Sequence, residues 1–192
     1  GPTRDQLRRE LRRWLTAAGV PVLLVTHDRG EAQSLADSLV VMDGGRVVQS
    51  GRVEDVFSRP ATPDIARAVG ADNVLPARVV AAAGGLTEAA VGAVRVWARG
   101  EVTPSGAAFV VIRGEEVVLA REDGGPGGTV NRWPGAVKSL AREGPLVRVV
   151  LDCGFPLTAL VTPQACRELR LAEGESVWAA VEPGAVHLMS SA

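Results

Sequence analysis

The sequence predicts an α/β segment followed by a β-rich part built as a small barrel of OB-like type. Three observations predict this division. Residues 1–70 alternate helical and strand patterns, and from about residue 72 only short β-rich runs recur. A run of glycine and proline at residues 124–128 interrupts the β-rich part. We therefore expect an α/β segment over 1–70, a divergent β-rich segment over 71–130 and an OB-like barrel over 131–192.

The first expected element is a helix that begins after Thr3 and ends at Gly19. Thr3 and Gln6 have the spacing of a capping box, in which each side chain bonds the backbone amide of the other residue. The helix carries one apolar stripe at helical spacing, formed by Leu7, Leu11, Trp14, Leu15 and Ala18. The opposite side, which we interpret as a solvated face, carries Arg8, Arg9, Arg12 and Arg13.

The following elements alternate as in α/β proteins. Val22–Val25 is a continuous apolar run, typical of a strand buried on both faces of a parallel sheet. A second helix begins at Asp28, and Glu31 has the spacing that completes a capping box. The residues that this helix is expected to bury are Ala32, Leu35, Ala36 and Leu39. A hairpin turns at Asp43–Gly45, and its strands and two short helices are expected at Val40–Met42, Arg46–Val48, Val53–Ser58 and Pro63–Val69.

The β-rich part consists of short runs separated by turn residues. Before the glycine-rich break these runs are Val74–Ala81, Ala93–Trp97, Ala108–Ile112 and Val117–Ala120. After it they are Trp133–Leu140, Leu146–Leu151, Leu157–Val161, Val177–Glu182 and Val186–Met189. Thr162 and Pro163 predict the start of a short helix. Five strands and one helix suit a small closed OB-like barrel, with Trp133 and Trp178 in its core. No fixed-period repeat is visible, although the two β segments remain candidates for related barrels.

Composition excludes several classes of protein. The formal net charge is −1, and residues 131–192 carry six cations and six acids, so we expect no nucleic-acid partner. No apolar run approaches the roughly 18–20 residues that cross a bilayer. Cys153 and Cys166 are too few for a disulfide scaffold and lack metal-site spacing, which favours a cytoplasmic setting. The chain begins Gly1-Pro2 rather than with Met, so we expect a fragment or a cleavage scar.

His27 is the strongest candidate for chemistry. It follows the expected strand Val22–Val25 and precedes the helix that Asp28 caps. In open α/β sheets ligands bind beyond the carboxyl ends of the strands, and a helix N-terminus there suits phosphate. A neutral imidazole can donate a hydrogen bond to a phosphate oxygen. By itself, however, a histidine in this position is more often structural.

The wider stretch resembles the ATPase subunits of ABC importers. The residues that carry the resemblance are Val25–Ala32, Leu35–Asp37, Val40–Gln49, Gly51 and Val56–Pro60. The resemblance implies that His27 is the switch histidine, which contacts the ATP γ-phosphate in the intact subunit. It also implies ATP and Mg as cofactors of that subunit, a second ATPase subunit as homodimer partner, and a transmembrane subunit. The setting would be the cytoplasmic face of the cell membrane.

The ATP-binding motifs themselves are missing from the sequence. A P-loop needs a Gly-Lys pair, but the single lysine, Lys138, follows Val137. No Leu-Ser-Gly-Gly-Gln-like signature occurs, and Gly44 stands where a catalytic glutamate would follow the Walker-B-like run Leu39–Asp43. We therefore expect that this chain alone neither binds nor hydrolyses ATP, and that it is the C-terminal portion of such a subunit.

Residues 131–192 resemble the accessory TOBE or Mop domain at the C-terminus of molybdate importer ATPases. The matching runs are Asn131–Val137, Leu151–Leu157, Ala159–Thr162 and Val186–Leu188. The resemblance implies a molybdate or tungstate partner, and the candidate oxyanion contacts are Thr129, Asn131, Lys138 and Ser139. Two departures oppose an oxyanion site, since Val130 replaces the family's arginine and Glu182 replaces a frequent lysine. A docking and regulatory role is favoured.

Two other functions are weighed against the importer subunit. A stand-alone molybdate or tungstate sensor or storage module is the alternative that the barrel suggests. A free-standing His-Asp hydrolase has no nucleophile or metal cluster in the sequence to support it.

Overall fold

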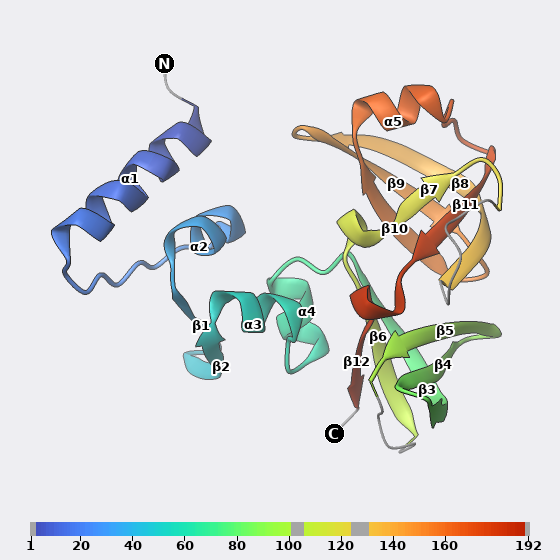
Figure 1. Ribbon diagram of the computed structural model, residues 1–192, viewed down its shortest axis with the longest axis horizontal. Helices are drawn as coiled ribbons and strands as arrows, with labels where there is room; N and C mark the ends of the chain where they lie inside the picture. The colour runs from blue at the N-terminus through green and yellow to red at the C-terminus, as the bar shows by residue number, and fades with distance from the viewer. Residues whose placement is uncertain (1–2, 101–105, 124–130, 191–192) are drawn as a thin grey trace. The chain divides into compact units, whose positions relative to one another are not determined.

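A computed structural model describes residues 3–100, 106–123 and 131–190 and divides the chain into two compact units (Figure 1). The first unit is Gly1–Gly70 and the second is Ala71–Ala192. Thr129, one of the candidate oxyanion contacts, lies outside the described residues. Within the described residues no helix is both long and apolar enough to cross a membrane.

The first unit contains four helices and one β-hairpin. Its elements are α1 (Arg4–Ala18), α2 (Arg29–Leu35), β1 (Ser38–Asp43), β2 (Arg46–Arg52), α3 (Val53–Ser58) and α4 (Pro63–Ala68). The expected hairpin turn is confirmed, because Gly44 and Gly45 take the left-handed φ values of 52° and 76° that this turn requires. The core of this unit is small and consists of Val53, Val56, Phe57, Ile65 and Val69.

The expected strand at Val22–Val25 is not formed. These residues have no regular secondary structure, and all four are exposed, Leu23 by 91% and Val25 by 90%. A strand exists only through hydrogen bonds to a neighbouring strand, and the described residues pair none with this segment. The expected α/β fold of this unit requires a parallel sheet, and the described residues of the unit form none.

The two sides of α1 are also reversed from the expectation. Leu7, Leu11 and Trp14 are exposed, Trp14 by 75%. The arginine side instead contacts α2, where Arg8 Nη2 lies 2.8 Å from Asp28 Oδ2 and Arg12 Nη1 donates to the Ser34 carbonyl at 2.7 Å. The solvated-face interpretation was therefore wrong for Arg8, whose side chain is 19% exposed, whereas Arg12 remains 48% exposed beside its contact with α2. Periodicity shows that a stripe exists but not which neighbour covers it.

The second unit consists of two five-stranded antiparallel sheets. One has the order β12-β6-β3-β4-β5 and the other β10-β9-β8-β11-β7. The strands before the glycine-rich run are β3 (Asn73–Ala83), β4 (Leu86–Val91), β5 (Val94–Arg99), β6 (Ala107–Ile112) and β7 (Val118–Ala120). Those after it are β8 (Asn131–Glu143), β9 (Leu146–Asp152), β10 (Pro156–Val161), β11 (Ser176–Val181) and β12 (His187–Ser190), with helix α5 (Pro163–Glu168). Sequence patterns missed β4.

The two sheets exchange their last strands. A 3-10 turn, η1 (Gly114–Glu116), follows β6, and the chain then pairs as β7 with β11 of the other sheet. A matching turn, η2 (Pro183–Ala185), sends β12 to pair with β6. The expectation that Val186–Met189 completes the C-terminal barrel was therefore wrong, since its fifth strand is Val118–Ala120.

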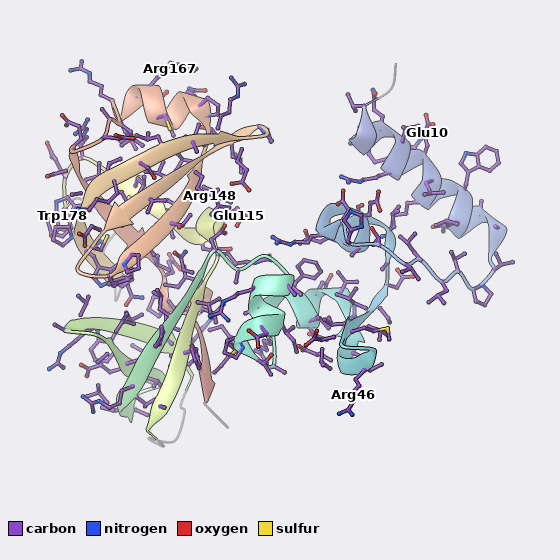
Figure 2. All side chains as sticks on the ribbon, turned by 180° about the vertical axis from the view of Figure 1, so that it is seen from behind. Glu10, Arg46, Glu115, Arg148, Arg167 and Trp178 are labelled. Atoms are coloured by element: carbon purple, nitrogen blue, oxygen red, sulfur yellow. The ribbon has the colours of Figure 1, made fainter. Side chains whose placement is uncertain are left out.

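The two halves of this unit repeat one another. β3 and β8 each begin with asparagine and carry proline three residues later, and each has a register shift at the same place, between Val79 and Ala81 and between Val137 and Ser139. One continuous apolar core joins both sheets. Within it Trp133 packs edge-on against Phe155 with ring centroids 5.2 Å apart. Trp178, expected in the core, is only half-buried and projects from the outer side of β11 (Figure 2).

Candidate functional site

His27 lies exposed at the start of α2, between two residues that are held in place. Asp28 caps the helix, its Oδ1 accepting from the Glu31 amide at 3.1 Å. Thr26 Oγ1 donates to Glu31 Oε2 at 2.6 Å and accepts from the Asp28 amide at 2.9 Å. The expected capping box is therefore altered, because the Glu31 carboxylate bonds the Thr26 hydroxyl instead of the Asp28 amide. These bonds fix the backbone on both sides of the imidazole.

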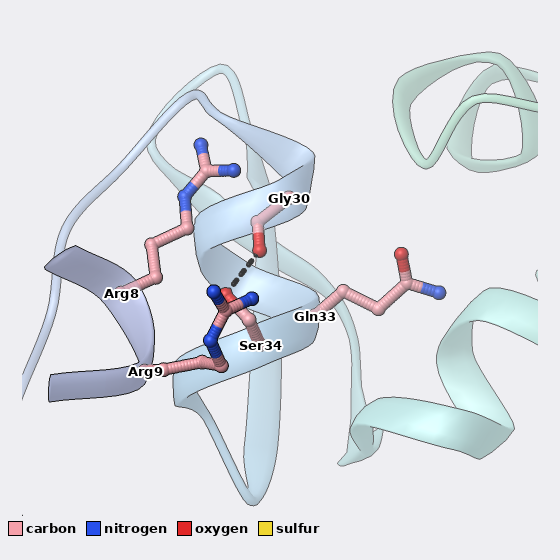
Figure 3. A pocket seen from close by; sticks show the side chains of 5 residues that line it. All are labelled: Arg8, Arg9, Gly30, Gln33 and Ser34. Atoms are coloured by element: carbon pink, nitrogen blue, oxygen red, sulfur yellow. Dashed lines mark hydrogen bonds between the residues drawn. The ribbon is translucent and has the colours of Figure 1, made fainter. Parts of the chain in front are cut away.

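The contact between α1 and α2 also stabilises the turn at residues 26–28, which contains His27. Arg8 is bonded to the same Asp28 carboxylate that caps α2, so α1 helps to fix the residue next to His27. Between the two helices lies an open pocket of about 340 Å³, lined by Arg8, Arg9, Gly30, Gln33 and Ser34 (Figure 3). Its lining residues do not include His27.

An extensive apolar surface is exposed on the first unit. Its large apolar side chains with more than two fifths of their surface exposed are Leu7, Leu11, Trp14, Val20, Val22, Leu23, Leu24, Val25, Val40, Met42, Val47 and Val48. Single exposed apolar residues are normal, but this number within 70 residues is not. The most exposed run of this surface, Val22–Val25, ends two residues before His27.

The three candidate oxyanion contacts that the structure describes do not gather at one place. Asn131 starts β8 and is buried, whereas Lys138 and Ser139 are exposed at the register shift of the same strand. A strand rises about 3.3 Å per residue, so Asn131 and Lys138 lie roughly 20 Å apart. Lys138 Nζ is 3.2 Å from Asp152 Oδ2. The hydrogen bond from Lys138 and that from the Gly154 amide lower the pKa of Asp152, so this carboxylate competes with any anion for Lys138.

Asn131 has a structural partner set instead. Its Oδ1 accepts from the Trp97 amide at 2.6 Å, and its Nδ2 donates to the carbonyls of Trp97 and Val181 at 2.8 and 3.1 Å. Asn73 does the same from the other repeat, bonding the amide and carbonyl of Thr158 and the carbonyl of Ile112. Each asparagine therefore bonds an edge strand of the opposite sheet. The shared Asn-x-x-Pro pattern was the signal in the sequence that could have revealed this pair.

Among the described residues no group of three or more His, Cys, Asp and Glu side chains is arranged to hold a metal ion. Burial raises the pKa of Cys153 to about 11, and the nearby Asp152 charge adds to this effect. Cys153 is therefore a protonated apolar side chain at neutral pH.

Comparison with known proteins identifies the C-terminal part of the chain. The model of the TOBE domain family matches residues 129–188. This part of the chain is a TOBE domain. A solved structure of the cytoplasmic molybdate-binding protein ModG shares its fold, with a TM-score of 0.58 and 23% identity over 63% of this chain and 97% of that one. At that identity the likeness shows the fold alone, and it supports the OB-like TOBE/Mop architecture.

Proteins similar to the whole chain are ATP-binding proteins of importers. The molybdate/tungstate import ATP-binding protein WtpC of Pyrococcus horikoshii is 34% identical over 187 residues, which are 97% of this chain and 52% of that protein. The Fe(3+) ions import ATP-binding protein FbpC of Streptomyces avermitilis is 43% identical over 61% of this chain and 32% of its own length. The chain spans about half the length of the molybdate/tungstate relatives that it matches. The resemblance to ABC importer ATP-binding subunits with a C-terminal TOBE domain is confirmed.

Proposed function

We propose that this chain is the C-terminal portion of the ATP-binding subunit of an ABC importer for molybdate or a related oxyanion. In that subunit it supplies the switch histidine, His27, and a regulatory and dimerising TOBE domain. The observation that carries the proposal is the apolar surface of the first unit, which is exposed next to His27. The Pyrococcus horikoshii relative matches 97% of this chain with only 52% of its own length. The remaining part of such a protein is available to cover this surface.

The geometry around His27 suits a histidine that contacts a phosphate bound by another segment. The imidazole is exposed, while Thr26, Asp28 and Glu31 fix the backbone around it. Because the backbone on both sides is fixed, this histidine can donate a hydrogen bond to a phosphate oxygen without ordering the surrounding backbone. ATP with Mg would supply the phosphoanhydride to be hydrolysed. The residues of this chain fit a γ-phosphate contact through His27, but the sequence holds no P-loop for the other phosphates.

The partners follow from the same proposal. They are the importer's transmembrane subunit and a second ATP-binding subunit, on the cytoplasmic face of the membrane. The segment Val22–Val25 is apolar and exposed, and it has no strand partner among the described residues. Such a segment is suited to join a sheet that another segment or chain supplies.

A complementation experiment tests the proposal. The purified chain is mixed with the part of the Pyrococcus horikoshii relative that it does not match, and complex formation and ATPase activity are measured. We expect neither half alone to hydrolyse ATP, the mixture to do so, and His27→Ala to abolish turnover while leaving the complex intact. His187→Ala, the other histidine of the chain, is the control and should retain activity. Micromolar ATP binding by the chain alone in calorimetry would contradict the proposal.

The alternative, a molybdate or tungstate sensor or storage module, is favoured by one observation, the fold shared with ModG. Retention of isotopic molybdate by the chain, lost on Lys138→Ala, would support it. The contact between Lys138 and Asp152 argues for weak retention, and Asp152→Asn should then increase it.

A further inference from the structure

The connection between the two units is very short. In the first unit the Val69 amide donates to the Ile65 carbonyl at 2.8 Å and the Gly70 amide to the Arg67 carbonyl at 3.1 Å, so the end of α4 is fixed up to Gly70. Gly70 itself has a φ of 92°, a value that favours glycine. The second unit begins at Ala71.

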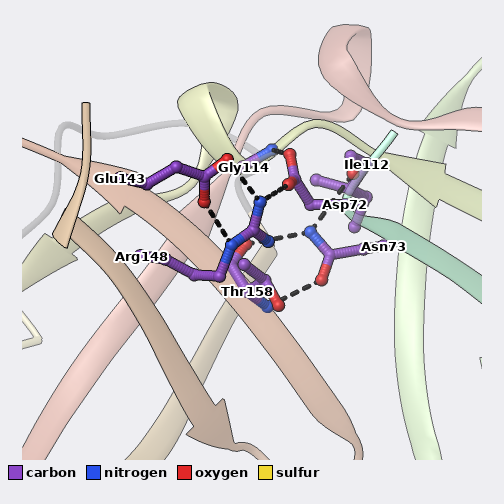
Figure 4. A network of polar contacts seen from close by, with 7 residues as sticks. All are labelled: Asp72, Asn73, Ile112, Gly114, Glu143, Arg148 and Thr158. Carbon is purple, nitrogen blue, oxygen red and sulfur yellow. Dashed lines mark hydrogen bonds and ion pairs between the residues drawn. The ribbon is translucent and has the colours of Figure 1, made fainter. Parts of the chain in front are cut away.

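Asp72, the next residue, is tied firmly into the second unit. Its side chain is only 6% exposed, and its Oδ1 lies 2.8 Å from Nη2 of Arg148 on β9. Its Oδ2 accepts from the Gly114 amide of η1 at 2.8 Å. Arg148 also bonds Glu143 at 2.5 Å, and together the two carboxylates raise the pKa of Arg148, the Glu143 hydrogen bond most strongly (Figure 4). Asn73 then bonds Thr158 of β10, so the chain is held from its second residue in this unit.

The internal repeat has a different residue type at the position of Arg148. Arg148 pairs across β8 with Ala141 and across β10 with Leu160. The position with the same register in the other sheet is Leu86, which pairs with Ala83. An apolar residue therefore serves the same place in the sister sheet. The Asp72 side chain is 6% exposed and that of Arg148 is 32% exposed, so the pair is partly buried. Such a pair is seldom more stabilising than an apolar substitute, so its presence on this side of the β domain calls for another reason.

That side is the one from which the chain leaves toward the first unit. We propose that the ion pair between Asp72 and Arg148 is an anchor that confines the hinge between the two units to Gly70 and Ala71. With the anchor in place, a movement of the first unit acts on the β domain through two residues. Without it, the movement is absorbed by fraying at the start of β3. The inference rests on the structure of the two units and does not depend on the proposed function.

The test uses two variants, each of which removes one charge of the ion pair. Asp72→Asn retains an oxygen for the Gly114 amide, and Arg148→Leu introduces the residue type of the sister sheet. The double variant combines them, and Glu143→Gln is the matched control because it changes Arg148's other partner. Amide hydrogen exchange is measured residue by residue over 71–76 and over the β8–β9 pairs. Backbone ¹⁵N relaxation reports how independently the two units tumble.

We expect the double variant to exchange at least about tenfold faster at residues 72–75, with the β8–β9 amides unchanged and the two units tumbling more independently. Glu143→Gln should leave all three readouts near those of the parent chain. Equal acceleration of the β8–β9 amides would overturn the inference, because the ion pair would then hold the β domain together as a whole. Unchanged exchange at residues 72–75 and unchanged tumbling would overturn it as well.

Discussion

At the scale of single residues, two asparagines decide how the β domain closes. Asn73 and Asn131 are buried, and each satisfies the amide and the carbonyl of one residue on an edge strand of the other sheet. A buried amide side chain is tolerated only when such bonds are made. The same bonds remove the exposed hydrogen-bonding groups that make edge strands prone to further pairing.

Replacing either asparagine should therefore destabilise the whole β domain. Asn131→Ala leaves the Trp97 amide and the carbonyls of Trp97 and Val181 without their partner, and Asn73→Ala does the same to Thr158 and Ile112. We expect each substitution to lower the free energy of unfolding by about 3 kcal/mol. Urea denaturation followed by tryptophan fluorescence measures this. If either variant lost less than about 1 kcal/mol, that asparagine would not contribute to the stability of the β domain as we expect.

The two cysteines should differ in reactivity. The pKa of Cys153 is raised to about 11 by burial, so at pH 8 only roughly a thousandth of it is thiolate. Cys166 is half-buried and should be alkylated first by iodoacetamide, as measured by mass spectrometry. Since the folded state holds the Cys153 proton more tightly, its contribution to stability is present below the ordinary thiol pKa and is lost as the pH rises toward 11. Cys153→Ala should remove this alkaline loss, and faster alkylation of Cys153 than of Cys166 would contradict the assignment.

At the scale of elements, the two 3-10 turns are equivalent in position but not in packing. An added Cβ at Gly114 would lie 2.8 Å from both Asp72 Oδ2 and Leu160 Cγ, whereas at Gly184 it would meet no atom of a described residue within 4 Å. The Gly114 amide also donates to Asp72, so the first turn is packed against the ion pair of Asp72 with Arg148.

Gly114→Ala and Gly184→Ala therefore form a matched pair. We expect the first to lower the free energy of unfolding by about 1–3 kcal/mol through overpacking. The second should stay within about 0.5 kcal/mol of the parent. Thermal unfolding followed by circular dichroism compares them. Similar values for both variants would mean that the turns tolerate a side chain equally and that the close contacts at Gly114 relax.

Helix α1 offers the second test at this scale. Its apolar stripe is exposed and its arginine side contacts α2, so Trp14→Gln and Leu11→Gln should leave the helix content of the chain unchanged. Arg8→Ala removes the ion pair with Asp28 and should increase amide exchange in α1. Exchange of the α1 amides by mass spectrometry distinguishes the two cases. Greater loss of protection in Trp14→Gln than in Arg8→Ala would show that the stripe is covered in solution.

At the scale of the whole molecule, the two units differ in how much apolar surface they bury. The five-residue core of the first unit is small beside the continuous core of the β domain, and the first unit carries most of the exposed large apolar side chains. Burial of apolar surface is the main source of folded stability. The two units should therefore not have equal stability.

Hydrogen exchange should show this difference directly. We expect amides of residues 3–70 to be less protected than those of residues 131–190, because fewer of them lie behind buried apolar contacts. Addition of the part of the Pyrococcus horikoshii relative that this chain does not match should raise protection in the first unit and leave the β domain unchanged. Greater protection of the first unit in the isolated chain would show that its apolar surface is covered without a partner.

The sequence by itself determined the helix caps, the hairpin turn and the family. The Thr3 cap, the Asp43–Gly45 turn and the Thr162 cap are set by hydrogen bonds and φ angles within a few residues, so they could be predicted from those residues. The position of His27 at the start of a capped helix could be predicted for the same reason.

Only the tertiary structure decided which elements pair. Periodicity gives a strand or a stripe but not its neighbour, so it could not show that β7 and β12 exchange sheets, or that Arg8 rather than Leu11 faces the next helix. Other decisive contacts join residues that are far apart in the sequence. They are the hydrogen bonds of Asn73 and Asn131, which span 34 to 85 positions, and the ion pair of Asp72 with Arg148. Such contacts depend on the folded register, which no local pattern contains.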